Sequence, residues 1–470
     1  MFLLCSLKLP LKEKHMPSFA LFDDTVVART AAASAGWTAF TDLQTVFDYA
    51  RNQGRPLFFQ PGVYDSGTTT VLPSNGGGKP LLARAMPGSV VLRFNGSNGF
   101  LRIEGQNQVH FDGITFDGQN RALSDYVGGR PAFIAIAGNA QDISFENCQI
   151  LNSPGIGAYV ASSSGAIFRA CYFGNHSVGI WSENAQIKAL SNTLAGMQNN
   201  GIAIWRDTIT GDSSTITGNF INGVDTVAGG TGQNGNGVSV FRAIGVSITD
   251  NKIFSTKFSA IRCNGGGLHN VSNNNIYNTR EVAIFIEAPG AGIDLTGCIV
   301  SNNSLDTVGS GILVANSGQF SDGISRSVVV EGNRISNVTD NPIPDAGYYP
   351  PSTIGNAIVV EQDCVVSGNL VEGAARVGIM AGINTAARDL IVTGNLVRSV
   401  AIGIGVSNEA VTNSGRSVVV SGNIVRSASI GGIVPTVFTG TTMNRVGTAE
   451  YGNDLATAVG SVTFGHNRYL

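Results

Sequence analysis

One phrase recurs through this chain and constrains its fold more than any other feature. It is a β-branched run, then Gly-Asn or a close variant, then an apolar pair, as in TITGNFI ending at Ile221 and VVSGNLV ending at Val371. Its asparagines lie mostly about 22 to 36 residues apart, a period typical of one coil of a parallel β-helix. They are Asn147, Asn192, Asn219, Asn251, Asn275, Asn333, Asn369, Asn395 and Asn423.

A second strand lies between these phrases, for example GIAIW at Gly201, GVSVF at Gly237 and GILVA at Gly311. Its alternation places one face inward and leaves the other face open. The 61 glycines and the charged fraction of only 13% suit β-strands joined by tight turns, and they make long helices improbable. The sequence therefore predicts an all-β protein, a right-handed single-stranded parallel β-helix of about a dozen coils.

The expected organisation is one domain with a cap at each end. Leu43, Val46 and Phe47 form a helical stripe that ends before Gly54, and a short helix there would cover the unpaired edge of the first coil. We expect these boundaries: an N-terminal extension at 1–37, a single β-helix domain at 38–470, a helical cap at about 38–52, and a terminal coil with its cover at about 436–470.

Two long insertions interrupt the coils with glycine and proline, at 222–235 and at 338–354. They should form loops. The first leads into the strand that carries Arg242 and could wall a groove, and the second carries Tyr348 and Tyr349.

Composition argues against several classes of protein. The formal net charge of −3 gives no basic field for binding nucleic acid. The six cysteines form neither a CxxC motif nor a Cys/His metal spacing. The apolar stretch Met1–Leu7 is followed at once by Lys8, so it is too short for a membrane span or a recognisable signal peptide.

Arginines of the middle coils indicate where a ligand would bind. When the second strands are aligned, Arg206, Arg242 and Arg262 become neighbours on one surface, about 4.8 Å apart per coil. Stacked cations repel one another, and an anionic partner would relieve that repulsion. Arginine forks bind carboxylates, and aromatic rings beside them suit the apolar faces of sugars. The alternative is that Glu183, Asp207 and Glu287 neutralise the arginines as surface ion pairs. The expected substrate-binding residues are Trp181, Trp205, Arg206, Asn236, Phe241, Asn264 and Glu287.

The leading functional hypothesis is a polysaccharide lyase that acts by β-elimination on an anionic, uronic-acid-containing polysaccharide outside the cell. That reaction needs a neutralised carboxylate, a base near the α-proton and a proton donor. Lys257, Arg242 and Arg262 are the candidates for base and acid. A possible Ca²⁺ ion could neutralise the substrate instead, bound by Glu183, Asp207 and Glu287. His176 is a weaker candidate, because a lone histidine in a turn is more often simply solvated.

Other functions stay open. A glycoside hydrolase needs paired carboxylates, such as Asp207 with Glu183 or Glu287 with another acid. It ranks second because the coils lack the Asp-Asp and Gly-His-Gly motifs of polygalacturonases. A uronate C5-epimerase could use the same face, as could a non-catalytic carbohydrate-binding or adhesive solenoid. A phage-type depolymerase would need trimerisation, for which no heptad segment is visible, and the oligomeric state stays open.

Several segments resemble a known family. These are RPLFFQPGVY from Arg55, GITFDGQNRAL from Gly113, GIAIWR from Gly201, GQNGNGVSVFRA from Gly232, FSAIRCN from Phe258 and EVAIF from Glu281. They are similar to the twin-arginine-translocated repetitive β-helix proteins of bacteria, in the pectin-lyase-like superfamily, over about residues 38–430.

The resemblance implies the fold, a secreted or periplasmic location and, by analogy of fold, a polysaccharide substrate. The family's recurrent polar positions match Arg206, Asn236, Arg242, Arg262, Asn264 and Glu281. The chain departs from the family in lacking twin arginines near its start, so the resemblance leaves the route of export open.

Overall fold

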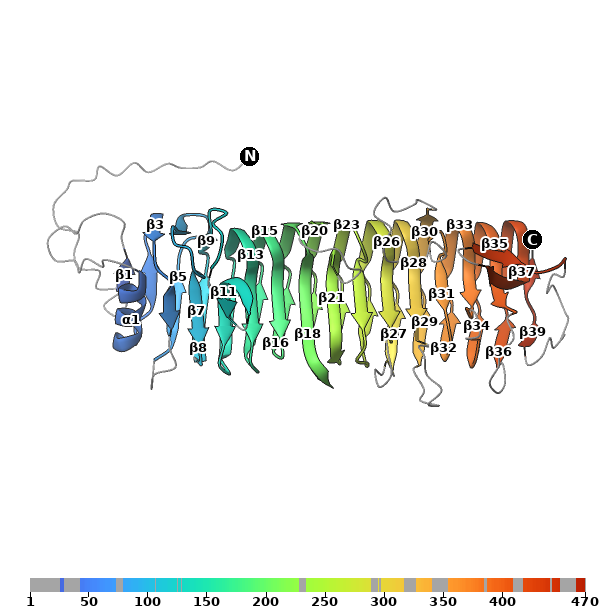
Figure 1. Cartoon of the computed structure of the whole chain (residues 1–470), viewed down its shortest axis with the longest axis horizontal. Coiled ribbons are helices and arrows are strands. Elements are labelled where there is room, and N and C mark those ends of the chain that lie inside the picture. Colours follow the sequence, from blue (N-terminus) through green and yellow to red (C-terminus); the bar gives the residue numbers. More distant parts are fainter. Residues whose placement is uncertain are drawn as a thin grey trace, which may run out of the picture.

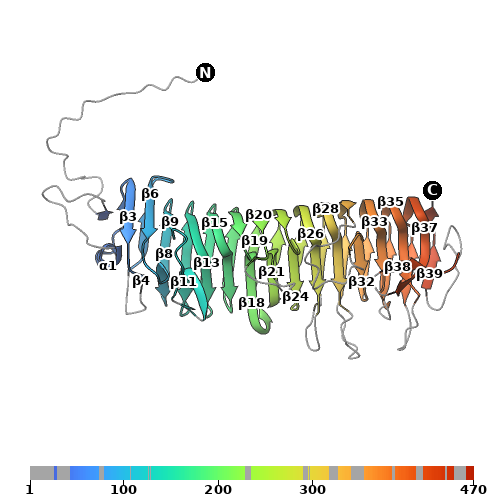
Figure 2. The same cartoon turned by 45° about the horizontal axis from the view of Figure 1, so that its top comes forward.

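Strands of the computed structural model stack side by side along one long axis, from α1 (Leu43–Gln53) at one end to β39 (Val462–Gly465) at the other, as Figure 1 and the turned view in Figure 2 show. The chain forms a right-handed parallel β-helix, as the repeat predicts. The structure describes residues 26–28, 43–72, 79–105, 107–124, 126–127, 129–227, 234–288, 295, 297–316, 327–339, 354–383, 387–408, 417–439, 442–448 and 462–469.

Sheet A contains one short strand from each coil, and all of its pairings are parallel. Within the described residues it has 16 strands, which is more coils than the dozen expected. They are β1 (Val26–Ala28), β2 (Leu57–Phe59), β5 (Leu81–Arg84), β8 (Asn107–Asp112), β12 (Gln141–Glu146), β14 (Gly165–Arg169), β16 (Gln186–Leu190), β19 (Thr215–Thr217), β22 (Ser247–Thr249), β25 (Asn270–Ser272), β27 (Cys298–Ser301), β29 (Val328–Glu331), β32 (Cys364–Ser367), β34 (Leu390–Thr393), β36 (Val418–Ser421) and β39.

Sheet B contains the other 24 strands of the described residues. They are β3 (Gly62–Ser66), β4 (Thr70–Leu72), β6 (Val90–Phe94), β7 (Leu101–Glu104), β9 (Thr115–Asp117), β10 (Tyr126–Val127), β11 (Arg130–Ala137), β13 (Gln149–Ala161), β15 (Tyr172–Glu183), β17 (Thr193–Met197), β18 (Asn200–Gly211), β20 (Phe220–Val224), β21 (Asn236–Ile244), β23 (Lys252–Thr256), β24 (Ile261–Asn264), β26 (Asn275–Glu287), β28 (Ser304–Ala315), β30 (Arg334–Val338), β31 (Ile358–Val360), β33 (Leu370–Ala381), β35 (Leu396–Ser407), β37 (Ile424–Thr439), β38 (Thr442–Arg445) and β40 (Arg468–Tyr469).

Each coil of sheet B has two arms. In some coils the arms are separate strands, such as β23 and β24, and in others one long strand such as β26 makes both. The long strands change register between the arms, for example between Thr279 and Val282 of β26. Outward alternation can therefore be followed within an arm but not across the junction.

An asparagine ladder runs through the interior of the solenoid. The Asn251 amide donates to the Oδ1 of Asn274 at 3.0 Å and to the carbonyl of Ile216 at 2.9 Å, and its own Oδ1 accepts from Asn219. Because each amide bonds both neighbouring coils, these buried polar groups are satisfied along the whole row. Its members are Asn192, Asn219, Asn251, Asn274, Asn303, Asn333, Asn369, Asn395, Asn423 and Asn467.

Two of the asparagines given for the repeat phrase lie outside this ladder. Asn274, not Asn275, points inward. Asn147 is exposed and bonds Asp112, while the buried Cys148 occupies the inward position beside it.

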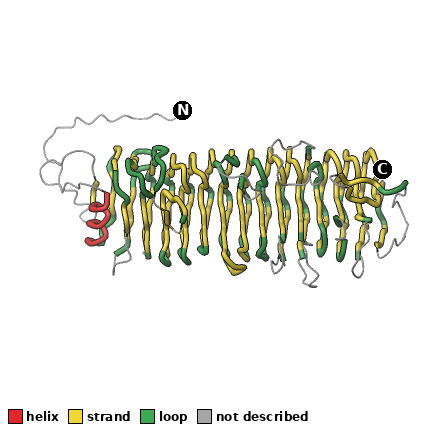
Figure 3. The backbone as a smooth tube through the Cα atoms, in the orientation of Figure 1, coloured by secondary structure: helices red, strands yellow, loops and turns green. Residues whose placement is uncertain are grey.

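The short helix α1 covers one end of the core, as Figure 3 shows. Phe47 packs edge-on against Phe59 and Phe111, with ring centroids 6.1 and 5.9 Å apart. The side-chain amide of Gln44 pairs with both the N–H and the C=O of Val71 at 2.7 Å, so it satisfies backbone groups of β4. A helix thus covers this end, as the sequence predicts.

The two ends differ in part from the expected boundaries. β1 lies inside the predicted extension, yet it pairs with β2 through Val26 and Leu57, so sheet A begins there. At the other end β37 and β38 form an antiparallel pair. Met1–Leu7, Tyr348 and Tyr349 lie outside the described residues.

Candidate functional site

The outer face of the second arm is apolar at both ends of the solenoid and polar in the middle. Its buried apolar side chains form two clusters separate from the interior core. One contains Ala132, Ala135, Ile156, Tyr159, Ala161, Val178 and Ala203, and the other contains Val282, Phe285, Leu313, Val359, Val377, Met380, Ile402 and Val434. Polar residues come between them in the middle coils. We call the following residues the polar interval: Ser239, Ser259, Arg262, Asn264, Glu281 and Glu287.

Five of the singled-out side chains lie in one straight column of this face. The register pairs Glu183 with Trp205, Trp205 with Phe241, Phe241 with Asn264, and Asn264 with Glu287. Four coil steps of about 4.8 Å make this column roughly 19 Å long. Aromatic residues therefore adjoin the polar interval along the axis of the solenoid.

The rings of Trp205 and Phe241 are stacked, with centroids 4.1 Å apart and planes at 29°, and both side chains are half-buried. The ring centroid of Trp181 is 6.4 Å from that of Trp205. Trp181 lies in the adjacent column, which also contains Ser239 and Arg262. We call Trp181, Trp205 and Phe241 the aromatic platform. Two of the three rings expected to bind substrate, Trp205 and Phe241, therefore share one column.

Arg262, Asn264 and Glu287 are brought together, and the pairing of Arg262 with Glu287 matches the alternative in which acids neutralise the arginines. Arg262 donates from Nε and Nη2 to Oε1 of Glu287 at 2.9 and 2.5 Å, and Asn264 donates to the same oxygen. The Arg262 side chain is only 5% exposed and that of Glu287 11%. Such a buried pair is held by mutual charge neutralisation, because either ion alone would be costly to bury.

Glu281 is the most unusual titratable group on this face. Its side chain is 1% exposed, and its Oε2 has no hydrogen-bond partner within the described part of the chain. Burial raises its pKa to about 8, although the charges of Arg262 and Arg280 act in the opposite direction. The carboxyl is therefore mostly protonated at neutral pH. The residues alone did not single out Glu281, which entered only through the family resemblance.

The predicted column of three arginines is wrong. Arg262 pairs in register with Ser239. It therefore lies one column away from Phe241, the residue that precedes Arg242 in the chain. Residues 206–209 of β18 stand opposite the single residue Arg242 of β21, because pairing resumes only at Thr210 with Ala243. This bulge removes Arg206 and Arg242 from the alternation that the sequence alignment assumed.

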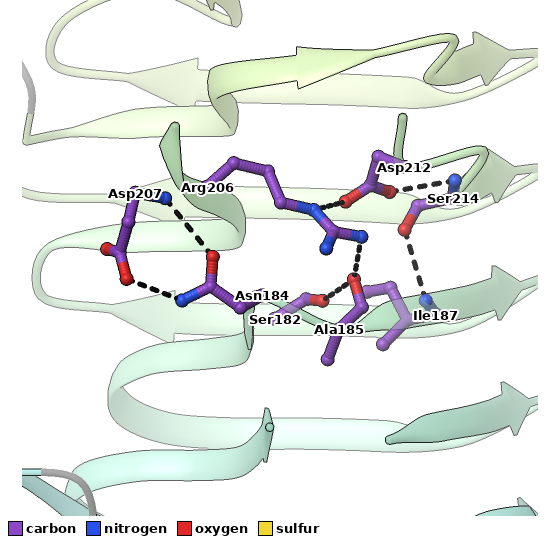
Figure 4. A network of polar contacts seen from close by, with 8 residues as sticks. All are labelled: Ser182, Asn184, Ala185, Ile187, Arg206, Asp207, Asp212 and Ser214. Atoms are coloured by element: carbon purple, nitrogen blue, oxygen red, sulfur yellow. Dashed lines mark hydrogen bonds and ion pairs between the residues drawn. The ribbon is translucent and has the colours of Figure 1, made fainter. Parts of the chain in front are cut away.

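The side chain of Arg206 is buried and serves the fold. Figure 4 shows it extending toward Asp212, which its Nε reaches at 2.7 Å, and toward the carbonyl of Ala185 at 2.9 Å. The other oxygen of Asp212 accepts from the N–H of Ser214. Arg206 is thus bonded internally, which corrects its assignment as a substrate ligand.

Arg242 lies on the platform. Its guanidinium carbon is 4.8 Å from the centre of the Phe241 ring, and its Nη1 donates to the carbonyl of Asp207 at 2.7 Å. Its φ of 55° places the backbone in the left-handed region, as the bulge requires.

Three further assignments are corrected by burial or pairing. Lys257 forms an ion pair with Asp225 at 2.7 Å at the junction of the two arms, so its amine is already engaged. Asn236 is fully buried and bonds Asn200 of the preceding coil, so it joins coils together. His176 is neither solvated nor available. Its ring is buried against backbone carbonyls, and burial lowers its pKa to about 4.

The acids proposed for Ca²⁺ have separate partners. Glu183 accepts from Arg130 at 3.1 Å and from the Tyr159 hydroxyl at 2.8 Å. Asp207 accepts from Asn184 at 2.7 Å (Figure 4). Across the described ranges, no group of three or more His, Cys, Asp or Glu side chains is placed to hold a metal ion. The proposed Ca²⁺ site is therefore not formed by these three acids.

The comparisons with known proteins bear on the fold. Residues 134–324 match the family model described as "Right handed beta helix region". No curated protein matches the chain. Within the described residues, no helix is both long and apolar enough to span a membrane.

Similar solved structures include the catalytic unit of a GH87 alpha-1,3-glucanase from Streptomyces thermodiastaticus strain HF3-3. The two chains are 12% identical, the match covers 94% of this chain and 69% of that chain, and the TM-score is 0.42. A mutant of the periplasmic alginate epimerase AlgG shares 11% identity over 87% of this chain and 79% of that chain, with a TM-score of 0.38. An N-terminal fragment of bacteriophage Phi29 gene product 12 shares 14% identity over 84% and 62%, with a TM-score of 0.46. The chain spans about two thirds of the length of the glucanase structures it matches. At these identities the likeness concerns the fold alone.

Proposed function

We propose that this protein is a polysaccharide-cleaving enzyme in which Glu281 is the proton donor. One observation carries the proposal: a buried carboxyl, protonated at neutral pH, lies on the same strand as an ion-paired carboxylate. Two carboxyl groups in opposite protonation states are what acid-assisted cleavage of a glycosidic bond requires. Glu281 would protonate the leaving oxygen.

The platform supports a glycan as the ligand. Half-buried rings beside a polar interval offer apolar surface for sugar rings and hydrogen-bonding groups for hydroxyls. Oδ1 of Asn264 and Oγ of Ser259 are buried without a hydrogen-bond partner within the described residues. Leaving such groups unsatisfied is costly, and sugar hydroxyls could satisfy both of them.

Hydrolysis is the favoured mode of cleavage, with Glu287 as the second carboxylate. Arg262 and Asn264 hold one oxygen of Glu287 and so fix its orientation. The other oxygen would face the sugar or an attacking water. The charge of Arg262 is already met by Glu287, which argues against Arg262 as the base or the acid of an elimination.

β-Elimination is the second candidate, and one observation favours it. The protonated carboxyl of Glu281 could donate a proton to the leaving oxygen in an elimination as well as in a hydrolysis, while a base removes the α-proton.

Access to Glu281 is part of the proposal. At 1% exposure its carboxyl can meet a glycan only if neighbouring groups move when substrate binds. Catalysis would then proceed in a site closed to bulk water.

The test is product analysis on a panel of neutral and uronic-acid polysaccharides, with the purified protein and the variant Glu281→Gln. New reducing ends without an unsaturated product indicate hydrolysis, and unsaturated uronate absorbance indicates elimination. Glu281→Gln should lower kcat by roughly 10²- to 10⁴-fold in either case. Cleavage unaffected by Glu281→Gln would overturn the proposal, and so would saturable binding of a glycan without any cleavage, which would indicate a binding solenoid.

A further inference from the structure

We propose that Arg242 and the Trp205–Phe241 stack form a subsite for an acidic sugar, separate from the residues that cleave the bond. This inference rests on the proposed function, because it names the class of polysaccharide that the same face would take. It also gives Arg242 the role of a specificity residue in place of a catalytic base or acid.

Charge pairing distinguishes Arg242 from the other cations of this face. Arg262 pairs with Glu287, Lys257 with Asp225, Arg206 with Asp212, and Arg130 with Glu183. Each of these cations already has a carboxylate. Within the described ranges, Arg242 has none within ion-pair distance, and its hydrogen bond from Nη1 goes to the neutral carbonyl of Asp207.

The guanidinium of Arg242 is held in place without being used up. Contact with the Phe241 ring at 4.8 Å and the bond from Nη1 to the Asp207 carbonyl fix its plane. A guanidinium carries five N–H groups in a rigid fork. With one N–H bonded to the Asp207 carbonyl, the fork can receive a carboxylate or a sulfate through two parallel hydrogen bonds.

The position of this fork suits an anionic substituent on a stacked sugar. Phe241 stacks on Trp205 and carries Arg242 as its immediate neighbour in the chain. A sugar ring packed against the exposed side of the stack would place a charged substituent next to the fork. An anion there would give Arg242 the charge partner that the described residues do not supply.

The subsite lies away from the proposed point of cleavage. Phe241 is two coil steps from Glu287, which is roughly 10 Å along the axis at about 4.8 Å per coil. Arg242 should therefore select the polymer and set its register, with little effect on the chemical step.

Binding tests this assignment independently of cleavage. Polygalacturonate, dextran sulfate and uncharged dextran are titrated calorimetrically against Glu281→Gln, which keeps the polymers intact, and against the same variant carrying Arg242→Ala. Loss of Arg242 should weaken binding of one or both anionic polymers roughly 10- to 100-fold and reduce its salt dependence. Binding of uncharged dextran should not change. The polygalacturonate and dextran sulfate arms separate a carboxylate ligand from a sulfate ligand.

The matched control is Lys188→Ala, an exposed cation of β16 in sheet A. It should bind all three polymers like its parent. Equal weakening by Arg242→Ala and Lys188→Ala would overturn the subsite, because it would indicate non-specific attraction, and so would unchanged binding in Arg242→Ala. Cleavage of a neutral polysaccharide without any effect of Arg242→Ala would contradict the subsite alone. Arg242-dependent binding without cleavage would contradict the proposed enzyme activity and support the subsite.

Discussion

Arg262 and Glu287 join adjacent coils through a single carboxylate oxygen, which accepts from Nε at 2.9 Å and from Nη2 at 2.5 Å. The pair is buried in the polar interval, between two apolar clusters of the outer face. A fold held by packing alone would extend those clusters into each other. Buried ion pairs add little net stability relative to apolar replacements, so the pair points to a role other than stability.

Two variants of this pair should differ in stability. Glu287→Gln removes the carboxylate that pairs with the buried Arg262 cation and should lower the free energy of unfolding by about 3–5 kcal/mol. The double variant Arg262→Met, Glu287→Met removes both charges at similar volume and should be within about 1–2 kcal/mol of the wild type. Urea unfolding of the two variants measures both values. A double variant less stable than Glu287→Gln would show that the pair itself stabilises the fold.

Glu281 should make stability depend on pH. Its pKa is about 8 in the folded protein and ordinarily 4.5, so the folded state holds a proton that the unfolded state releases between these values. The contribution of this proton to the free energy of unfolding is fully present below about pH 4.5. It is lost as the pH rises through about 8, which lowers stability by on the order of 5 kcal/mol. Glu281→Gln cannot titrate and should lose less stability over the same range. Urea unfolding at pH 5 and pH 9 checks this, and parallel pH profiles of the two proteins would contradict it.

Truncation of Arg206 should destabilise the fold much more than truncation of Arg242. Arg206→Ala leaves the buried Asp212 carboxylate without its partner and should cost about 3–5 kcal/mol of unfolding free energy. Arg242→Ala removes a surface side chain and should cost no more than about 1 kcal/mol. Chemical denaturation of both variants separates a structural arginine from one available to a ligand. Similar losses in the two variants would count against that division.

The asparagine ladder should carry a large share of local stability. Asn251→Ala removes an amide that bonds Asn219, Asn274 and a backbone carbonyl, and each buried group left unsatisfied costs about 1–3 kcal/mol. A loss of roughly 3–6 kcal/mol is expected, measured by urea unfolding. The control is Asn147→Gly, which precedes a ladder position but is exposed, and which tolerates the φ of 52° found there. That variant should lose less than about 1 kcal/mol.

The repeat predicted the fold because a parallel solenoid stacks identical positions, so periodicity in the sequence becomes columns in space. It could not show whether Asn274 or Asn275 points inward, because three consecutive asparagines occupy that turn and any of them fits the phrase. It placed Asn147 in the row, whereas the buried thiol of Cys148 beside it takes the inward position near one end.

Sequence alternation placed the residues of the candidate site in the right columns only where a strand is continuous. Trp205, Phe241, Asn264 and Glu287 fell into one column because alternation fixes which side chains point outward. The arginine column failed at the bulge after Trp205, where the extra residues of β18 break the alternation. Glu281 was hard to find because it lies at the junction of the two arms, where no simple period applies.

The pH dependence of kcat/KM on the cleaved polysaccharide tests the central claim most directly. If Glu281 donates the proton, the rate should fall on the alkaline side with an apparent pKa of about 8, and Glu281→Gln should lack this limb along with most of the activity. A wild-type profile that stays level through pH 8 and 9, or an alkaline limb that persists in an active Glu281→Gln enzyme, would contradict the assignment.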